Sequence, residues 1–202
     1  MDMGSSEPTV LVHLFAFLLG MLCAYLAGSV NFSILLLKIL GKEDPRDQYS
    51  GNPGVTNVFR QHGRFIAAMV LVLDVSRAIV VALTAIYFWI DAWVPWAGFG
   101  LILGNRLPCF HGFKGGKGVA NYLGFCVIPL PLGTGVAVIA YLLTITIVRI
   151  PFVASFVMLA ILTVSGISHW GHTFVGLSAV LMIAISIVWF HRSNISKLLD
   201  RK

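Results

Sequence analysis

Residues 9–40 read TVLVHLFAFLLGMLCAYLAGSVNFSILLLKIL, and Lys38 is the only Lys, Arg, Asp or Glu in this stretch. A helix of about 20 apolar residues can cross a bilayer, so the stretch is long enough to span a membrane. Asp2 and Glu7 precede it in place of basic residues, and it is far longer than the roughly 7 to 15 apolar residues of a secretory signal peptide. The sequence therefore predicts a first membrane helix that is retained.

The composition of the whole chain indicates the same class of protein. Its 202 residues are 58% hydrophobic and 11% charged, with a mean hydropathy of +0.90, whereas soluble domains are about 45 to 50% apolar. Cys23, Cys109 and Cys126 are odd in number and fit neither a disulfide framework nor a zinc-binding spacing. We predict an all-α integral membrane protein with a single domain over residues 1–202 and no metal site.

Seven helical spans are expected from the apolar runs and the residues that interrupt them. The interruptions include Asp91, Pro129 and Pro151, and proline disfavours helix at the residue before it. The expected spans are residues 9–40, 65–90, 92–103, 119–128, 132–148, 152–168 and 173–190, followed by a tail over 191–202.

The basic residues predict the orientation of these spans. If the amino terminus is outside, the loops after the first, third and fifth spans, the C-terminal tail and Lys38 contain every Lys and Arg except Arg77. Cytoplasmic loops are enriched in Lys and Arg, so we expect the carboxyl terminus to be cytoplasmic. The net charge of +6 then reflects topology, and nucleic acid is not an expected partner. Asp74 and Arg77, three residues apart in the second span, are expected to pair with each other.

The first polar motif is YSGNPGVTN at residues 49–57, between two predicted spans. Glycine allows a close backbone approach, proline favours a turn, and the hydroxyl and amide side chains can hydrogen-bond, so the segment could form an anion-binding nest. Its composition is equally that of an ordinary turn. Arg60 would reach the same place if a helix begins at this motif.

The second polar motif is GFKGGKG at residues 112–118, which leads into the span that starts at Val119. Free amide groups at a helix N-terminus attract phosphate. A nucleotide-binding P-loop requires Ser or Thr directly after its lysine, and Gly118 stands there; the dinucleotide fingerprint fails because Asn121 replaces its third glycine. The alternative is a flexible basic loop that serves only topology.

The third polar motif is HRSNISKLL at residues 191–199. A helix would place His191 and Asn194 on one face, where they could bind an oxyanion. The alternative is an amphipathic tail whose basic residues lie at anionic lipid head groups.

Taken together, the motifs resemble a known family in their order and spacing. Ser50-Gly-Asn-Pro-Gly-x-Thr-Asn57, Gly104-x-x-x-Pro108 running into Phe113-Lys-Gly-Gly-Lys-Gly-Val119, and His191-Arg-x-Asn-Ile-x-x-Leu198 are similar to segments of the bacterial acyl-phosphate:glycerol-3-phosphate acyltransferases. The resemblance implies a multi-pass protein of the bacterial inner membrane with a cytoplasmic active site. It also implies transfer of a fatty acyl group from acyl phosphate to the 1-hydroxyl of sn-glycerol 3-phosphate. Membrane lipids surround such an enzyme, and no cofactor or obligate protein partner is expected.

The resemblance also implies residue roles. The implied catalytic residues are Ser50, Asn105, His191 and Asn194. The implied acyl-phosphate ligands are Ser50, Gly51, Asn52, Gly54, His191 and Asn194, and the implied glycerol 3-phosphate ligands are Thr56, Asn57, Arg60, Lys114, Gly115, Gly116, Lys117 and Gly118. These groups would act by positioning and by stabilising charge, with the substrate's own phosphate as the base. A serine, histidine and carboxylate triad is not expected.

One position departs from the family pattern. Asn105 stands where the family usually has histidine, and an amide can neither take up a proton nor become cationic at neutral pH. Two other functions therefore remain open: a relative that binds glycerol phosphate or anionic lipid without turnover, and a transporter of a phosphorylated solute. The absence of an inverted repeat argues against transport.

Overall fold

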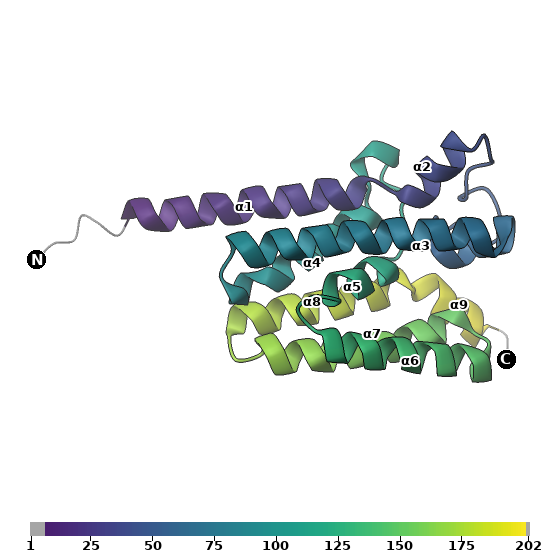
Figure 1. Ribbon diagram of the computed structural model, residues 1–202. Helices are drawn as coiled ribbons and strands as arrows, with labels where there is room; N and C mark the ends of the chain where they lie inside the picture. Colours follow the sequence, from purple (N-terminus) through teal and green to yellow (C-terminus); the bar gives the residue numbers. More distant parts are fainter. Residues whose placement is uncertain (1–6, 201–202) are drawn as a thin grey trace, which may run out of the picture.

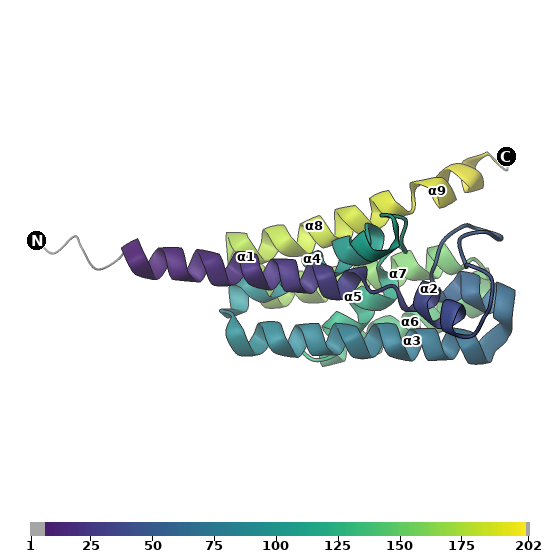
Figure 2. The same cartoon turned by 90° about the horizontal axis from the view of Figure 1, so that it is seen from above.

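The computed structural model describes residues 7–200, which form nine α-helices and two short 3-10 helices and no strand. The α-helices are α1 (Glu7–Ser29), α2 (Phe32–Ile39), α3 (Val55–Phe88), α4 (Val94–Arg106), α5 (Val119–Cys126), α6 (Pro131–Val148), α7 (Pro151–Trp170), α8 (Phe174–Phe190) and α9 (Arg192–Leu199). The 3-10 helices are η1 (Asp91–Trp93) and η2 (Cys109–His111). The longer helices run nearly parallel to one axis, and α2, α9 and the loop between α2 and α3 lie at one end of the molecule in both views (Figure 1, Figure 2).

Four helical segments are long and apolar enough to cross a bilayer: residues 11–29 of α1, and α3, α6 and α7. A fifth candidate arises if α8 and α9, bent by 48° at their junction, count as one broken span. The protein is thus an all-helical, multi-pass membrane protein. Every predicted span contains a helix, but α4 has 13 residues and α5 has 8, against about 20 for a full crossing.

The prediction of one continuous helix over 9–40 was wrong. α1 ends at Ser29, and α2 begins at Phe32 after a break. Asn31 has an extended conformation, and its side-chain oxygen accepts a hydrogen bond from the amide of Ile34 at 3.2 Å. Asparagine is a favoured N-cap because its side chain accepts a hydrogen bond from a backbone amide of the first turn. The cap at Asn31 therefore starts a new helix at Phe32 in place of a continued α1.

The second predicted span also begins earlier than expected. The sequence predicts a polar connection over residues 41–64 and a helix from Phe65, whereas α3 begins at Val55 and continues to Phe88. The helical geometry is interrupted only at Gly63, whose φ of 79° suits glycine. This early start places Thr56, Asn57 and Arg60 on the first turns of α3, so that these polar side chains project from a helix.

The remaining predicted boundaries differ by at most three residues from those of α4, α5, α6, α7 and α8. α4 packs closely on α1 through two glycines. A Cβ atom on Gly104 would lie 2.0 Å from the carbonyl oxygen of Tyr25, and one on Gly28 would lie 2.1 Å from that of Leu101. Small residues allow membrane helices to approach with their backbones in contact. This contact holds the C-terminal end of α4 in a fixed position beside the connecting loops.

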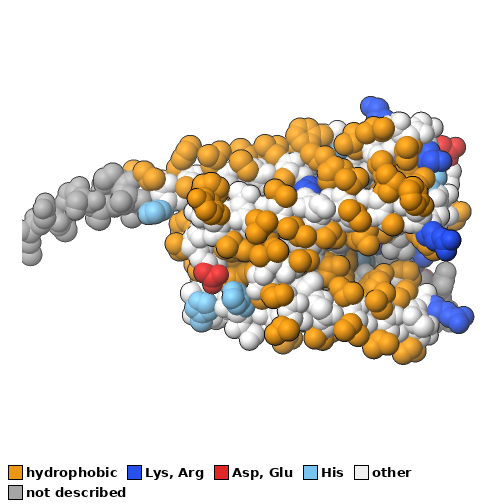
Figure 3. Space-filling view, in the orientation of Figure 1, with side chains coloured by type: hydrophobic (Ala, Val, Ile, Leu, Met, Phe, Trp, Pro, Cys, Tyr) orange, Lys and Arg blue, Asp and Glu red, His pale blue; other side chains and the backbone are white. Residues whose placement is uncertain are grey.

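Side chains of different kinds occupy different parts of the surface. Apolar side chains cover the sides of the helices, while Lys and Arg gather at the end that carries α2 and α9 (Figure 3). Asp74 and Arg77 are the charged pair within α3, and the Nη2 of Arg77 lies 2.8 Å from the Oδ1 of Asp74. The predicted pairing of these two residues is confirmed. The uncharged sides suit contact with a membrane, and the basic end suits an aqueous face.

Candidate functional site

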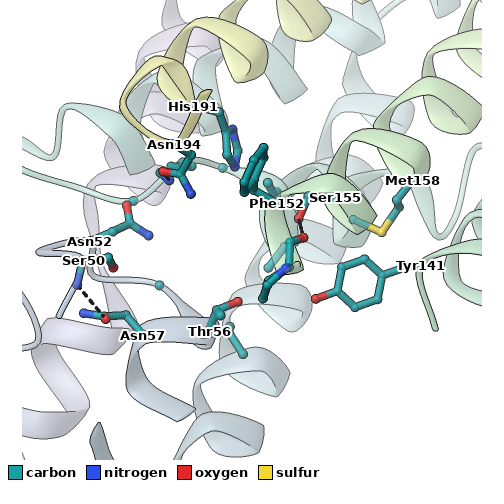
Figure 4. A pocket seen from close by; sticks show the side chains of 18 of the residues that line it. Ser50, Asn52, Thr56, Asn57, Tyr141, Phe152, Ser155, Met158, His191 and Asn194 are labelled. Atoms are coloured by element: carbon teal, nitrogen blue, oxygen red, sulfur yellow. Dashed lines mark hydrogen bonds between the residues drawn. The ribbon is translucent and has the colours of Figure 1, made fainter. Parts of the chain in front are cut away.

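A cavity of about 740 Å³ opens at the basic end of the bundle. It is bordered by the loop before α3, the loop before α5 and the junction of α8 with α9, with α6 and α7 completing the wall. In Figure 4, Ser50, Asn52 and Asn194 lie on one side of the cavity, Tyr141 and Met158 lie across from them, and Phe152 lies beside His191. All three polar motifs therefore meet at one cavity.

Asn57 shapes the first of these loops. It is buried, and its Nδ2 donates to the carbonyl oxygens of Pro45 at 2.7 Å and Gln48 at 3.2 Å. Its Oδ1 accepts a hydrogen bond from the amide of Ser50 at 3.3 Å (Figure 4). Gly51, at φ 64°, allows the chain to turn directly after Ser50. The side chain of Asn57 thus uses its hydrogen bonds to hold the loop in shape. Ser50 and Asn52 of this loop line the cavity.

The second loop is fixed to the end of α4 by backbone hydrogen bonds. The amide of Gly115 donates to the carbonyl of Arg106 at 3.1 Å, and the amide of Gly116 donates to that of Asn105 at 2.9 Å. A Cβ atom on Gly115 would lie 2.0 Å from the Asn105 oxygen. Gly118 caps α5 at φ 82°. Glycine is therefore needed at Gly115 for close packing and at Gly118 for backbone conformation.

Lys117 connects this loop to the third motif, because its Nζ donates to the Oδ1 of Asn194. The pKa of Lys117 is lowered to about 8, chiefly by burial and further by the cations Arg106, Lys197 and Arg60. A bound anion would stabilise the charged form of Lys117 and raise its pKa towards the ordinary value.

His191 lies between α8 and α9, where the helix bends. It is buried, and its Nδ1 donates to the carbonyl of Ile187 at 2.8 Å, since a carbonyl can only accept. The ring also makes an edge contact with Phe156, with centroids 5.2 Å apart. These contacts fix the orientation of the ring and leave Nε2 as the nitrogen available to a ligand.

Asn105 is buried beneath the second loop and lines the cavity. Its backbone oxygen holds Gly116, and a Cβ atom on Gly116 would lie 2.8 Å from the Asn105 Nδ2. The amide side chain is therefore packed against the glycine loop at the edge of the cavity.

The polar part of the cavity is cationic. Arg60, Lys117, Arg149 and Lys197 line it from four different elements, and the acidic residue in its lining, Asp74, is already paired with Arg77. Such a site suits ligands that carry phosphate groups. The other part of the cavity is apolar, with Leu71, Leu123, Val138, Leu142 and Met158 in its wall. An amphiphile with a phosphorylated head and a hydrocarbon chain matches both parts.

Comparison with known proteins identifies the family. The family model described as glycerol-3-phosphate acyltransferase matches residues 18–201. The chain belongs to this family. It is 35% identical over 189 residues to the glycerol-3-phosphate acyltransferase of Methylobacillus flagellatus, covering 89% of this chain and 91% of that one. It is 40% identical over 182 residues to that of Erythrobacter litoralis, covering 88% and 89%.

Solved structures give the same result. A crystal structure of PlsY, an integral membrane glycerol 3-phosphate acyltransferase in its glycerol 3-phosphate form, superposes with a TM-score of 0.83 at 32% identity and covers 92% of both chains. The lysophosphatidic acid form of PlsY superposes with a TM-score of 0.81. The predicted family is thereby confirmed.

Most of the predicted site residues of this acyltransferase line the cavity. They are Ser50, Asn52, Gly54, Thr56, Asn57, Arg60, Asn105, Gly116, Lys117, Gly118, His191 and Asn194. Gly51 and Lys114 line a second cavity instead, and Gly115 is buried against Asn105 and lines neither.

Sequence reasoning missed part of the lining. Arg149 lines the cavity but is absent from the predicted site, although a cation directly after the apolar run 132–148 is a signal that the sequence contains. Lys197 was included in the third motif without a role of its own. The apolar wall could not be recognised, because its residues do not differ in type from lipid-facing ones.

Proposed function

We propose that this acyltransferase moves a fatty acyl group from acyl phosphate to the 1-hydroxyl of sn-glycerol 3-phosphate, giving lysophosphatidic acid and inorganic phosphate. The observation that carries the proposal is the meeting of all three polar motifs at one cavity, whose cationic part adjoins an apolar groove. The acyl donor needs both parts, since its phosphate is anionic and its chain is hydrocarbon. The two forms of PlsY, with glycerol 3-phosphate and with lysophosphatidic acid, support the same acceptor and product here.

The proposed reaction is a direct acyl transfer. The 1-hydroxyl oxygen of glycerol 3-phosphate attacks the acyl carbon, the bond between that carbon and the phosphate oxygen breaks, and the hydroxyl proton passes to the phosphate of the donor. Phosphate departs as an anion, so groups that stabilise negative charge accelerate the step. We assign Ser50, Asn52, Gly54, His191 and Asn194 to the acyl phosphate, with Nε2 of His191 facing it.

The acceptor is assigned to the same polar part, beside the acyl phosphate. Thr56 and Arg60 project from the first turns of α3, and Lys117 with Gly116 and Gly118 comes from the second loop. Two cations from separate elements can hold the phosphate of glycerol 3-phosphate so that its 1-hydroxyl meets the acyl carbon. Asn57 supports this arrangement through the Ser50 amide, and Lys114 and Gly115 support it from behind the loop.

We also propose the finer topology expected from the sequence: one domain, seven spans, an external amino terminus and a site on the cytoplasmic face of a bacterial inner membrane. The grouping of Lys and Arg at the end that carries the cavity supports this orientation (Figure 3). α4 and α5 are too short to cross a bilayer by themselves, since the 8 residues of α5 extend about 12 Å. These two spans would therefore need the longer helices around them.

Asn105 favours one alternative, a protein that binds its ligands with little or no turnover. The test uses purified protein, palmitoyl phosphate and glycerol 3-phosphate, with mass detection of lysophosphatidic acid. We expect product from the wild type and its loss in Lys117→Ala, with Lys42→Ala, an exposed lysine outside the cavity, as the matched control. Product only after Asn105→His would support the alternative, and solute flux into liposomes without acylation would support transport.

A further inference from the structure

A second cavity, of about 850 Å³, lies at the same end of the molecule between α2, the loop over residues 41–54 and the segment from η2 to Lys114. Its wall is basic at Lys38, Arg46 and Lys114 and apolar at Ile34, Leu35 and Phe110. None of these six residues lines the reaction cavity.

The cations of this cavity differ in their availability. Arg46 is held by Asp44 through two close contacts, Nε to Oδ1 at 2.9 Å and Nη2 to Oδ2 at 2.6 Å, and its Nη1 donates to the carbonyl of His111 at 2.8 Å. The hydrogen bond from Arg46 lowers the pKa of Asp44. The negative charge of Asp44 in turn neutralises that of Arg46. Within residues 7–200, Lys38 and Lys114 have neither an ion pair nor a side-chain hydrogen bond.

The other polar groups in the wall do not remove the positive charge. Asp47 is the second carboxylate, so three cations face two carboxylates. Burial, together with the charges of Arg46 and Lys38, lowers the pKa of His111 and so favours its neutral form. Lys38 also stands in the last turn of α2, where the negative end of the helix dipole favours its charged form.

The two cavities share a wall made by the motif loops. Gly51 faces the second cavity, and its neighbours Ser50 and Asn52 line the reaction cavity. In the same way Lys114 faces the second cavity and Lys117 the first. A ligand in the second cavity would therefore contact the backs of both loops that line the reaction cavity.

We propose that the second cavity binds the phosphate group of an anionic phospholipid, with Lys38 and Lys114 as its cationic ligands and its hydrocarbon chain along Ile34, Leu35 and Phe110. A phosphate ion has no use for an apolar wall, whereas a lipid uses both. Phe110 is 61% exposed, and Ile39 beyond Lys38 is 72% exposed, so the apolar surface continues outward from the cavity. This second cavity is distinct from the reaction cavity, and the lipid proposed for it does not depend on the proposed reaction.

The experiment counts bound dioleoyl phosphatidate on the full-length protein by native mass spectrometry from a neutral detergent. We expect two phosphatidate sites in the wild type, one in the second cavity and one in the reaction cavity. Lys38→Gln/Lys114→Gln should weaken one of them about thirtyfold, because each basic group near an anionic lipid contributes about a factor of five. Lys42→Gln, an exposed lysine that lines neither cavity, should stay within twofold, and Lys117→Gln should keep the second site.

Three outcomes would overturn the proposal. One is equal phosphatidate binding by the wild type and the double variant. Another is the loss of all binding in Lys117→Gln, which would leave the reaction cavity alone. The third is displacement of phosphatidate by millimolar inorganic phosphate, which would make the cavity a site for the free ion. Lys38→Gln alone, expected to weaken binding about fivefold, provides the same test if the double variant does not fold.

Discussion

Arg77 connects three parts of the molecule from inside α3, and its replacement gives the sharpest test of the fold. Its side chain is 8% exposed and donates hydrogen bonds to Asp74, to the carbonyl of Val30 between α1 and α2, and to Asn121 of α5. Asn31, next to Val30, donates from Nδ2 to the carbonyl of Pro53 at 3.4 Å. The buried pair of Asp74 and Arg77 is thus linked to the first motif loop by hydrogen bonds at Val30 and Asn31, between α1 and α2.

Arg77→Met should leave the Asp74 carboxylate buried without its partner. Removing one member of a buried ion pair costs about 3 to 5 kcal/mol. At roughly 2 to 4 °C per kcal/mol for a chain of this size, the midpoint of thermal unfolding should fall by about 6 to 20 °C. The measurement is thermal unfolding of the purified protein in detergent, followed by tryptophan fluorescence.

Two further variants make this prediction refutable. Arg64→Met, at an exposed arginine of the same helix, should change the midpoint by no more than about 2 °C, since surface substitutions stay within about 0.5 kcal/mol. Asp74→Asn/Arg77→Met should recover a large part of the loss, because the uncompensated charge is gone. A fall of less than about 2 °C in Arg77→Met, or simple additivity in the double variant, would refute the coupling described above.

Three other predictions concern the loops. Gly115→Ala should lower the initial rate of acyl transfer at least about tenfold, because its Cβ would displace the Asn105 oxygen that holds Gly116; Gly135→Ala, where a Cβ meets no atom within 4 Å, should keep the rate. Because Lys117 loses its charge as pH rises through about 8, kcat/KM should fall above that pH, while the phosphates, with a second pKa of about 6, stay ionised; an unchanged kcat/KM up to about pH 9 would contradict the assignment. Asn57→Ala should destabilise the protein by about 3 kcal/mol, about 1 for each of three lost hydrogen bonds, and chemical denaturation would measure it; a loss below about 1 kcal/mol would show that the loop holds without them.

The sequence was sufficient to predict the membrane class, most helix ends and the meeting of the polar motifs. Apolar runs bounded by charges and prolines identify helices directly. Ser50, Lys117 and Asn194, far apart in the chain, line one cavity, as expected from motifs that are predicted to lie on one face of the membrane.

Other features depended on tertiary contacts that sequence patterns do not encode. The break at Asn31 lies in an apolar run, and only its cap and the bond to Pro53 distinguish it from a helical asparagine. The early start of α3 was hidden by polar residues typical of loops. Lys114 and Lys117 could not be assigned to different cavities, because the glycines between them allow many backbone paths.

The most direct test of the central claim is a single-turnover reaction of the purified protein with palmitoyl phosphate whose acyl oxygen carries an isotopic label, in the presence of glycerol 3-phosphate. With the label on the carbonyl oxygen of palmitoyl phosphate, direct transfer predicts lysophosphatidic acid that retains the label, inorganic phosphate that carries none, and no acylated protein at any time. An acylated protein intermediate, or the absence of lysophosphatidic acid while both ligands bind, would contradict it.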